Sequence, residues 1–165
     1  MDRGQIALKL SIDSLGLKFQ IDDFRDRLIL QKAVYLVQAA GVHLGYYYQW
    51  YLHGPYSPSL TRDAYPMSAE LASGMDESQG WKLGEHSRKR LKQIQNLVVG
   101  EGPQEDRARW LELLASVHFL IDRGQVPGID AKKICETLGR FKKTFTEAEV
   151  QAAIADLKEY ELLKA

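Results

Sequence analysis

Apolar residues recur at helical spacing along most of the chain. In 5–16, Ile6 and Leu10 fall on one face of a helix. Between 24 and 40 almost every residue is apolar, which is typical of a helix buried on all sides, so we expect this to be the central helix. Further helices are predicted from Pro58 to about Tyr65, over 86–99, over 104–122, for about ten residues after Asp130, and after Thr146.

Local capping signals fix several helix boundaries. Ser57 followed by Pro58 places a hydroxyl at the N-cap and a proline at the first helical position, which is a common helix start. Thr146 and Glu149 have the spacing of a capping box, in which each side chain bonds the backbone N–H of the other residue. Pro66 lacks an N–H, so we expect it to interrupt or end the third helix.

The aromatic segment 46–52 is the best candidate for a strand, because aromatic side chains favour a half-buried pleated surface. Side chains alternate between the two faces of a strand, which puts Tyr46, Tyr48 and Trp50 on one face and Tyr47, Gln49 and Tyr51 on the other. We expect a short strand at about 81–83 to pair with this segment. The chain is therefore predicted to be mainly α, a compact bundle of about seven helices with a small two-stranded β element.

The composition bounds the class of protein. A chain of 165 residues predicts one domain, 1–165, within which 104–165 is a candidate C-terminal helical subdomain. The 22 Lys and Arg residues balance 22 Asp and Glu residues, so strong binding to nucleic acid is not expected. The sequence has neither a secretory leader pattern nor the run of about 20 apolar residues that a membrane span needs, so we expect a cytoplasmic protein without membrane contact.

Residues with catalytic or metal-binding chemistry are few. Cys135 follows Ile134 on the apolar side of a predicted helix, where a cysteine is ordinarily a small core residue. No two of the four histidines stand four residues apart, the spacing that would place two ligands on one helix face. We therefore expect no enzyme, no catalytic residue, no metal site and no cofactor.

Gln31 is a polar residue inside the apolar helix 24–40. A buried amide without hydrogen-bond partners costs about 1–3 kcal/mol, so this side chain needs partners nearby. The tyrosine hydroxyls and the backbone of the turn after 46–52 are natural partners. We expect a polar clamp that holds the strand and turn on the central helix, formed by Gln31, Tyr35, Trp50, Gly54 and Pro55.

The segment 28–63 combines three features in an unusual order: a helix with Leu-Gln-Lys-x-x-Tyr-Leu at 30–36, a strand with Trp50, and Gly54-Pro55 before the next helix. With these features it resembles the Panacea-domain family, which includes SocA-type antitoxins and many phage-associated small proteins. The resemblance covers about a third of the chain. It implies a compact helical protein that neutralises a toxin by binding it, and it brings no catalytic residues.

The first functional hypothesis is therefore a non-enzymatic protein-binding module, antitoxin-like or phage-defence-associated, that acts by contact with a partner protein. The partner could be a toxin, and a homodimer is a second form of the same hypothesis. Tyrosine is enriched at protein interfaces because it gives a large contact area at a low entropic cost. The candidate partner surface is Tyr47, Tyr51 and Tyr56.

The alternative hypothesis is a DNA-binding transcriptional regulator of winged-helix type. It would use the basic residues Arg88, Lys89 and Lys92 of the predicted helix 86–99 as part of a wing or arm. The ordinary interpretation of the same residues is a solvated helix face. Salt-dependent binding to a DNA fragment would discriminate the two hypotheses.

Overall fold

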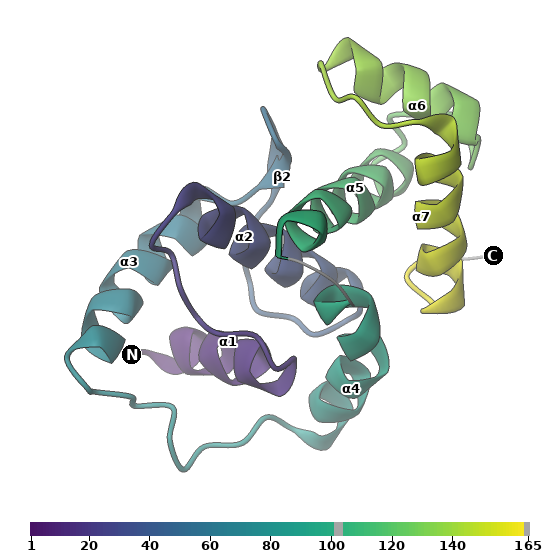
Figure 1. Ribbon diagram of the computed structural model, residues 1–165. Helices are drawn as coiled ribbons and strands as arrows, with labels where there is room; N and C mark the ends of the chain where they lie inside the picture. Colours follow the sequence, from purple (N-terminus) through teal and green to yellow (C-terminus); the bar gives the residue numbers. More distant parts are fainter. Residues whose placement is uncertain (101–103, 164–165) are drawn as a thin grey trace.

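The computed structural model describes residues 1–100 and 104–163 and is mainly α-helical (Figure 1). Two three-residue strands form one antiparallel hairpin, in which Trp50 lies opposite Pro55. The elements are α1 (Arg3–Ser14), α2 (Phe24–Ala39), β1 (Gln49–Tyr51), β2 (Gly54–Tyr56), α3 (Pro58–Ala72), α4 (Glu85–Val99), α5 (Gln104–Asp122), α6 (Ala131–Arg140) and α7 (Glu147–Glu159). The predicted class, a helical bundle with a small two-stranded β element, is confirmed.

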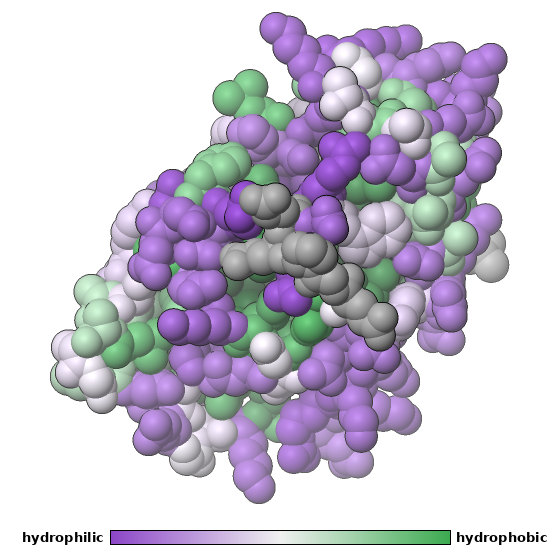
Figure 2. Space-filling view, in the orientation of Figure 1, coloured by the Kyte–Doolittle hydropathy of each residue, from purple (hydrophilic) through white to green (hydrophobic). Residues whose placement is uncertain are grey.

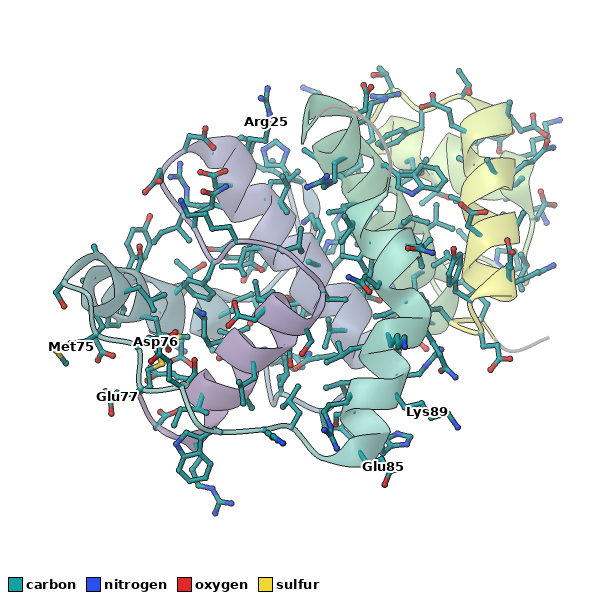
Figure 3. All side chains as sticks on the ribbon, turned by 60° about the horizontal axis from the view of Figure 1, so that its bottom comes forward. Arg25, Met75, Asp76, Glu77, Glu85 and Lys89 are labelled. Atoms are coloured by element: carbon teal, nitrogen blue, oxygen red, sulfur yellow. The ribbon has the colours of Figure 1, made fainter. Side chains whose placement is uncertain are left out.

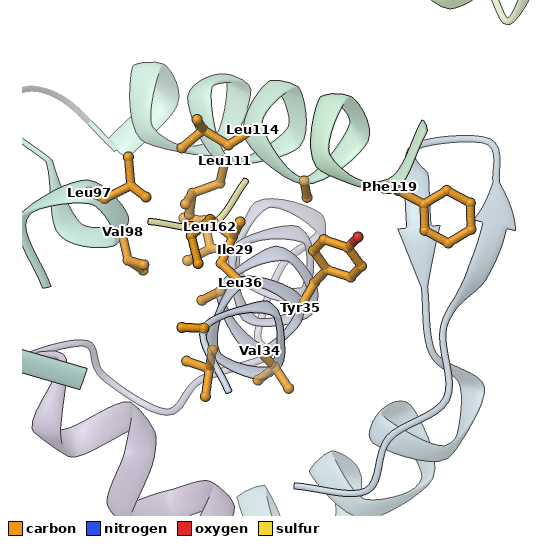
Figure 4. Packing of buried hydrophobic residues seen from close by; sticks show 14 of the residues in the cluster. Ile29, Val34, Tyr35, Leu36, Leu97, Val98, Leu111, Leu114, Phe119 and Leu162 are labelled. Atoms are coloured by element: carbon orange, nitrogen blue, oxygen red, sulfur yellow. The ribbon is translucent and has the colours of Figure 1, made fainter. Parts of the chain in front are cut away.

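Helix α2 lies at the centre of the core because it is apolar on nearly every side. It contacts α1, α4, α5 and β2. Figure 4 shows Ile29 and Leu36 of α2 beside Leu111 and Leu114 of α5, and all four side chains are buried. The expectation that 24–40 is the central, buried helix is confirmed.

The remaining helices surround this α2–α5 pair. Helices α1 and α4 pack against each other and against α2, and α7 packs against α5 and α6. In Figure 1, α6 and α7 lie at one end of the molecule, while α1, α3 and α4 lie at the other. The hairpin contacts both α2 and α5, so its position is fixed by the two central helices.

The predicted helix starts are confirmed by the cap geometry. The Ser57 hydroxyl accepts a hydrogen bond from the backbone N–H of Leu60, and Pro58 is the first residue of α3. Thr146 and Glu149 form the reciprocal bonds of a capping box at the start of α7. These starts depend on a few neighbouring residues only, which is why the sequence predicts them well.

Helix α3 corrects one expectation, because it continues through Pro66 to Ala72 rather than ending near Tyr65. Pro66 is exposed, so the carbonyl that loses its helical N–H partner lies on the solvent side of the helix. The flanking Ala64 and Met67 are buried in the core. Burial of the helix on both sides of the proline outweighs the one lost hydrogen bond.

The strand prediction was wrong in its extent and in its partner. The strand covers 49–51 rather than 46–52, and it pairs with 54–56 rather than with 81–83. A two-residue turn returns the chain directly onto β1, so the nearest segment pairs before a distant one can. The predicted division of side chains is nevertheless confirmed, since Tyr48 is buried whereas Tyr47 and Tyr51 are exposed.

Candidate functional site

An apolar groove lies between the first half of α2, the hairpin and the first half of α3; we call it the hairpin groove. It encloses about 370 Å³, which is within the range of about 300–1,000 Å³ typical of ligand pockets. Its walls include Leu28 of α2, Tyr56 of β2 and Leu60 of α3. Lys32 of α2 bonds Pro55 of β2, and Gln31 bonds Ser57 and Thr61 at the start of α3, so the hairpin and α3 are both held to α2 around the groove.

Four large apolar side chains line this groove and are exposed to solvent. Leu52 at the hairpin tip is 87% exposed, Phe24 55%, Tyr65 53% and Tyr51 44%. Figure 2 shows hydrophobic side chains near the hairpin tip on a face that is otherwise largely hydrophilic. Contiguous exposed apolar surface of this kind typically marks an interaction site.

Gln31 fixes the floor of the groove. Its amide nitrogen donates to the Ser57 carbonyl at 2.9 Å and to the Thr61 hydroxyl at 3.0 Å. Its amide oxygen accepts from the Ser57 N–H at 2.9 Å. Gln31 is buried, so the prediction that its amide bonds the turn after the strand is confirmed.

Lys32, the next residue, is fully buried and reaches the same turn. Its ammonium group donates to the Pro55 carbonyl at 2.6 Å. Burial lowers the pKa of Lys32 to about 7; the negative charge of Glu112 opposes this shift, and the positive charge of Lys143 adds to it. Sequence reasoning did not single out Lys32 as a functional group, because a lysine ordinarily extends its charged end to solvent even from an apolar helix.

A second lysine holds the hairpin from its other side. Lys143, in the connector between α6 and α7, donates to the Leu52 carbonyl and to a carboxylate oxygen of Glu112, both at 3.0 Å. Nδ1 of His53 lies 3.5 Å from the same Glu112 oxygen. Two carbonyls therefore anchor the hairpin: that of Pro55 in β2 binds Lys32 of α2, and that of Leu52 in the turn binds Lys143.

Gly54 allows the hairpin to lie this close to α5. Its φ is +85°, a left-handed conformation that favours glycine. A Cβ atom at this position would overlap the hydroxyl of Ser116 and lie 3.9 Å from the Lys32 nitrogen. The side-chain hydroxyl of Ser116 is buried without a hydrogen-bond partner among the described residues.

The structure does not bring all the predicted clamp residues to the turn. Gln31 bonds Ser57, whereas the Pro55 carbonyl accepts from Lys32, and Gly54 lies next to Ser116. The Tyr35 hydroxyl instead pairs with Nδ1 of His118 at 2.7 Å, while the Trp50 ring packs on other aromatic rings. Tyr35 and Trp50 therefore contact residues of α5, and Trp50 also contacts Phe141, rather than the Gln31 amide.

The His118 ring, which pairs with the Tyr35 hydroxyl, makes a second hydrogen bond on its other nitrogen. Its Nε2 lies 3.0 Å from the Leu162 carbonyl, which can only accept a hydrogen bond. Nε2 therefore carries the proton, and Nδ1 accepts from the Tyr35 hydroxyl. Burial lowers the pKa of His118, in accord with this neutral form.

The predicted partner surface is divided between two places. Tyr51 and Tyr56 line the hairpin groove, with their ring centroids 5.3 Å apart, and the Tyr56 hydroxyl pairs with that of Thr61 at 2.6 Å. Tyr47 is 63% exposed but does not line the groove. The predicted surface did not include Phe24, Leu52 and Tyr65, which come from α2, the hairpin turn and α3 and line the groove together in the fold.

The alternative basic surface lies on α4. Arg88, Lys89 and Lys92 are all exposed, and Figure 3 shows Lys89 and Glu85 projecting outward from this helix. Within the described residues the only sheet is the hairpin at 49–56, which contacts α2 and α5. The segment 81–83 is therefore not part of a sheet, and the DNA-binding hypothesis stays a prediction that rests on the basic residues of α4.

Among residues 1–100 and 104–163, no three or more His, Cys, Asp or Glu side chains are grouped in a way that could hold a metal ion. None of the helices described in these ranges combines the length and the apolar character needed to cross a membrane. Compared with protein-family models, curated proteins and solved structures, the chain matches none of them. The Panacea-domain resemblance thus stays a prediction that rests on the residues of 28–63.

Proposed function

We propose that this chain is a non-enzymatic, cytoplasmic protein-binding module that receives an apolar segment of a partner protein in the hairpin groove. The observation that carries the proposal is the gathering of four exposed large apolar side chains around one existing cavity. Their exposure is unfavourable in water, and covering them with a partner would release that free energy. The resemblance adds that the module is antitoxin-like or phage-defence-associated and that its partner could be a toxin.

The rigidity of the groove supports the same proposal. Gln31 and Lys32 tie the turn to α2, and Lys143 ties the hairpin tip to the C-terminal part of the chain. A groove that is already ordered loses little conformational entropy when a partner binds. Interface hot spots are typically aromatic anchors in such preformed, well-packed pockets.

Selection of a displayed random dodecapeptide library on the purified protein tests this proposal. We expect enriched peptides that bind the wild type and lose binding to Leu52→Asp, which puts a charge at the edge of the groove. Met75→Asp is the matched control, because Met75 is also exposed but lies outside the groove. Peptides that bind all three proteins equally, or no enrichment at all, would contradict the proposed function.

A further inference from the structure

Apart from its tyrosines, the ionisable side chains that line the hairpin groove are basic. Arg27 and Lys32 of α2 and His53 of the hairpin turn line it, and no Asp or Glu is among its lining residues in the described part of the chain. Behind the hairpin, Lys143 pairs with Glu112. Arg27 supplies a full positive charge to the groove, and Lys32, whose pKa burial lowers to about 7, supplies a partial one. The whole chain, by contrast, has a formal net charge of zero.

Arg27 is placed to meet a ligand at the edge of this groove. One terminal nitrogen of its guanidinium group, Nη1, donates to the Ile21 carbonyl at 3.1 Å, which orients the group. A guanidinium group carries five N–H donors in a planar fork that fits a carboxylate. Next to apolar walls, such a pair is less exposed to water and to salt than a pair on an open surface.

We propose that the natural occupant of the hairpin groove is an acidic amphipathic segment of a partner protein. Its apolar side chain fills the groove between Tyr51 and Leu60, and an Asp or Glu beside it pairs with Arg27. This inference rests on the proposed function and adds the chemistry of the partner to it. The apolar contact supplies affinity, while the positive field rejects basic segments of equal hydrophobicity.

The charge of the selected peptides tests this assignment. Dodecapeptides enriched on the wild-type protein are expected to combine large apolar residues with a net negative charge. Selection on Arg27→Glu is expected to shift the enriched peptides toward Lys and Arg. The best acidic peptide from the wild type should lose affinity for Arg27→Glu by about tenfold or more in fluorescence polarisation, because one attraction becomes a repulsion.

Lys89→Glu is the matched control, since it reverses an exposed positive charge on α4, outside the groove. It should leave the affinity within about twofold. Circular dichroism checks that Arg27→Glu folds. If it does not, Arg27→Gln removes the charge with a smaller change, and the acidic peptide must still lose affinity for it.

Three results would overturn the inference. Neutral or basic peptides that bind through Leu52 and ignore Arg27 would overturn the acidic partner but leave the proposed function intact. Failure to enrich any peptide that depends on Leu52 would remove the proposed function together with the inference. A wild type that is dimeric by light scattering and becomes monomeric in Leu52→Asp would identify the occupant as a second copy of this chain.

Discussion

Gln31 and Lys32 illustrate how neighbouring polar residues in an apolar helix differ in predictability. Gln31 has an amide that must be paired when buried, so its bonds to the turn follow from the sequence. A lysine ordinarily extends its charge to solvent, so the sequence alone favours an exposed Lys32. The hairpin and α5 close over this side of α2, and the ammonium group pairs with the Pro55 carbonyl instead.

Replacement of Gln31 by leucine should destabilise the protein. Gln31→Leu removes three hydrogen bonds and leaves the Ser57 N–H buried without a partner, while the Ser57 carbonyl keeps the bond from the Thr61 N–H. We expect a loss of about 1–3 kcal/mol in the free energy of unfolding, measured by urea denaturation. Gln151→Leu is the control, because Gln151 is exposed on α7 and should change stability by less than about 0.5 kcal/mol. Equal stability of Gln31→Leu and the wild type would show that the clamp contributes nothing.

Lys32 should give the protein a stability that rises with pH. Its pKa is about 7 in the folded protein and about 10.4 in an unfolded chain. Between these values the unfolded chain binds more protons than the folded one, so the free energy of unfolding increases with pH, by up to about 1.4 kcal/mol per unit. Below about pH 7 both states hold the proton, and the cost of burying the charge is present in full.

The measurement compares wild type with Lys32→Met in urea denaturation at several pH values from about 6 to 9. Methionine matches the apolar stem of lysine and does not titrate. The stability of the wild type relative to the variant should increase across this range, while the buried tyrosines contribute equally to both proteins. A difference that stays constant with pH would mean that Lys32 keeps the ordinary pKa of lysine.

At the level of elements, the sequence predicts features that depend on a few neighbouring residues, such as helix starts. It does not predict features that depend on packing against distant segments, such as the end of a helix. The starts of α3 and α7 follow from caps a few residues long. The end of α3 does not, because burial of Met67 and its neighbours carries the helix past Pro66. The strand at 49–51 was predicted from its aromatic residues, but its partner depended on a tight turn that leaves only three residues in each strand.

The hairpin should be sensitive to any side chain at position 54. Gly54→Ala combines a left-handed backbone with an overlap between the new methyl group and Ser116. Gly80→Ala is a close control, since Gly80 has the same φ of +85° and nothing within 4 Å of the new Cβ. The backbone term of about 1–2 kcal/mol is common to both, and the overlap adds about 1–3 kcal/mol to Gly54→Ala alone.

Thermal denaturation of the two glycine variants tests this, with a lower Tm expected for Gly54→Ala. Equal melting temperatures would mean that the hairpin moves away from α5 at little cost. In that case the wall of the hairpin groove would be adjustable, and the rigidity argued for the site would be wrong.

At the level of the whole molecule, the groove itself could be predicted only in part. Tyr51 and Tyr56 come from a segment whose aromatic content marks it as a surface of interest. Phe24 and Tyr65 stand apart from that segment, at the start of α2 and within α3. They join the site because the Phe24 ring contacts the His53 ring of the hairpin turn and Tyr65 lines the same groove, which is a property of the packing and not of the local sequence.

Two exposed tyrosines, Tyr51 in β1 and Tyr47 in the segment before it, should contribute differently to binding, because only one of them lines the groove. Tyr51 lines the groove at 44% exposure, whereas Tyr47 is 63% exposed and lies outside it. Tyr51→Ala should weaken binding of a groove-selected peptide by at least about 2 kcal/mol, roughly a thirtyfold loss of affinity, because it removes an aromatic anchor. Tyr47→Ala should leave the affinity unchanged.

Circular dichroism should show both variants folded, since truncating a side chain with this much exposure costs little stability. Loss of binding in Tyr47→Ala but not in Tyr51→Ala would place the partner surface outside the hairpin groove, along the chain that leads into β1.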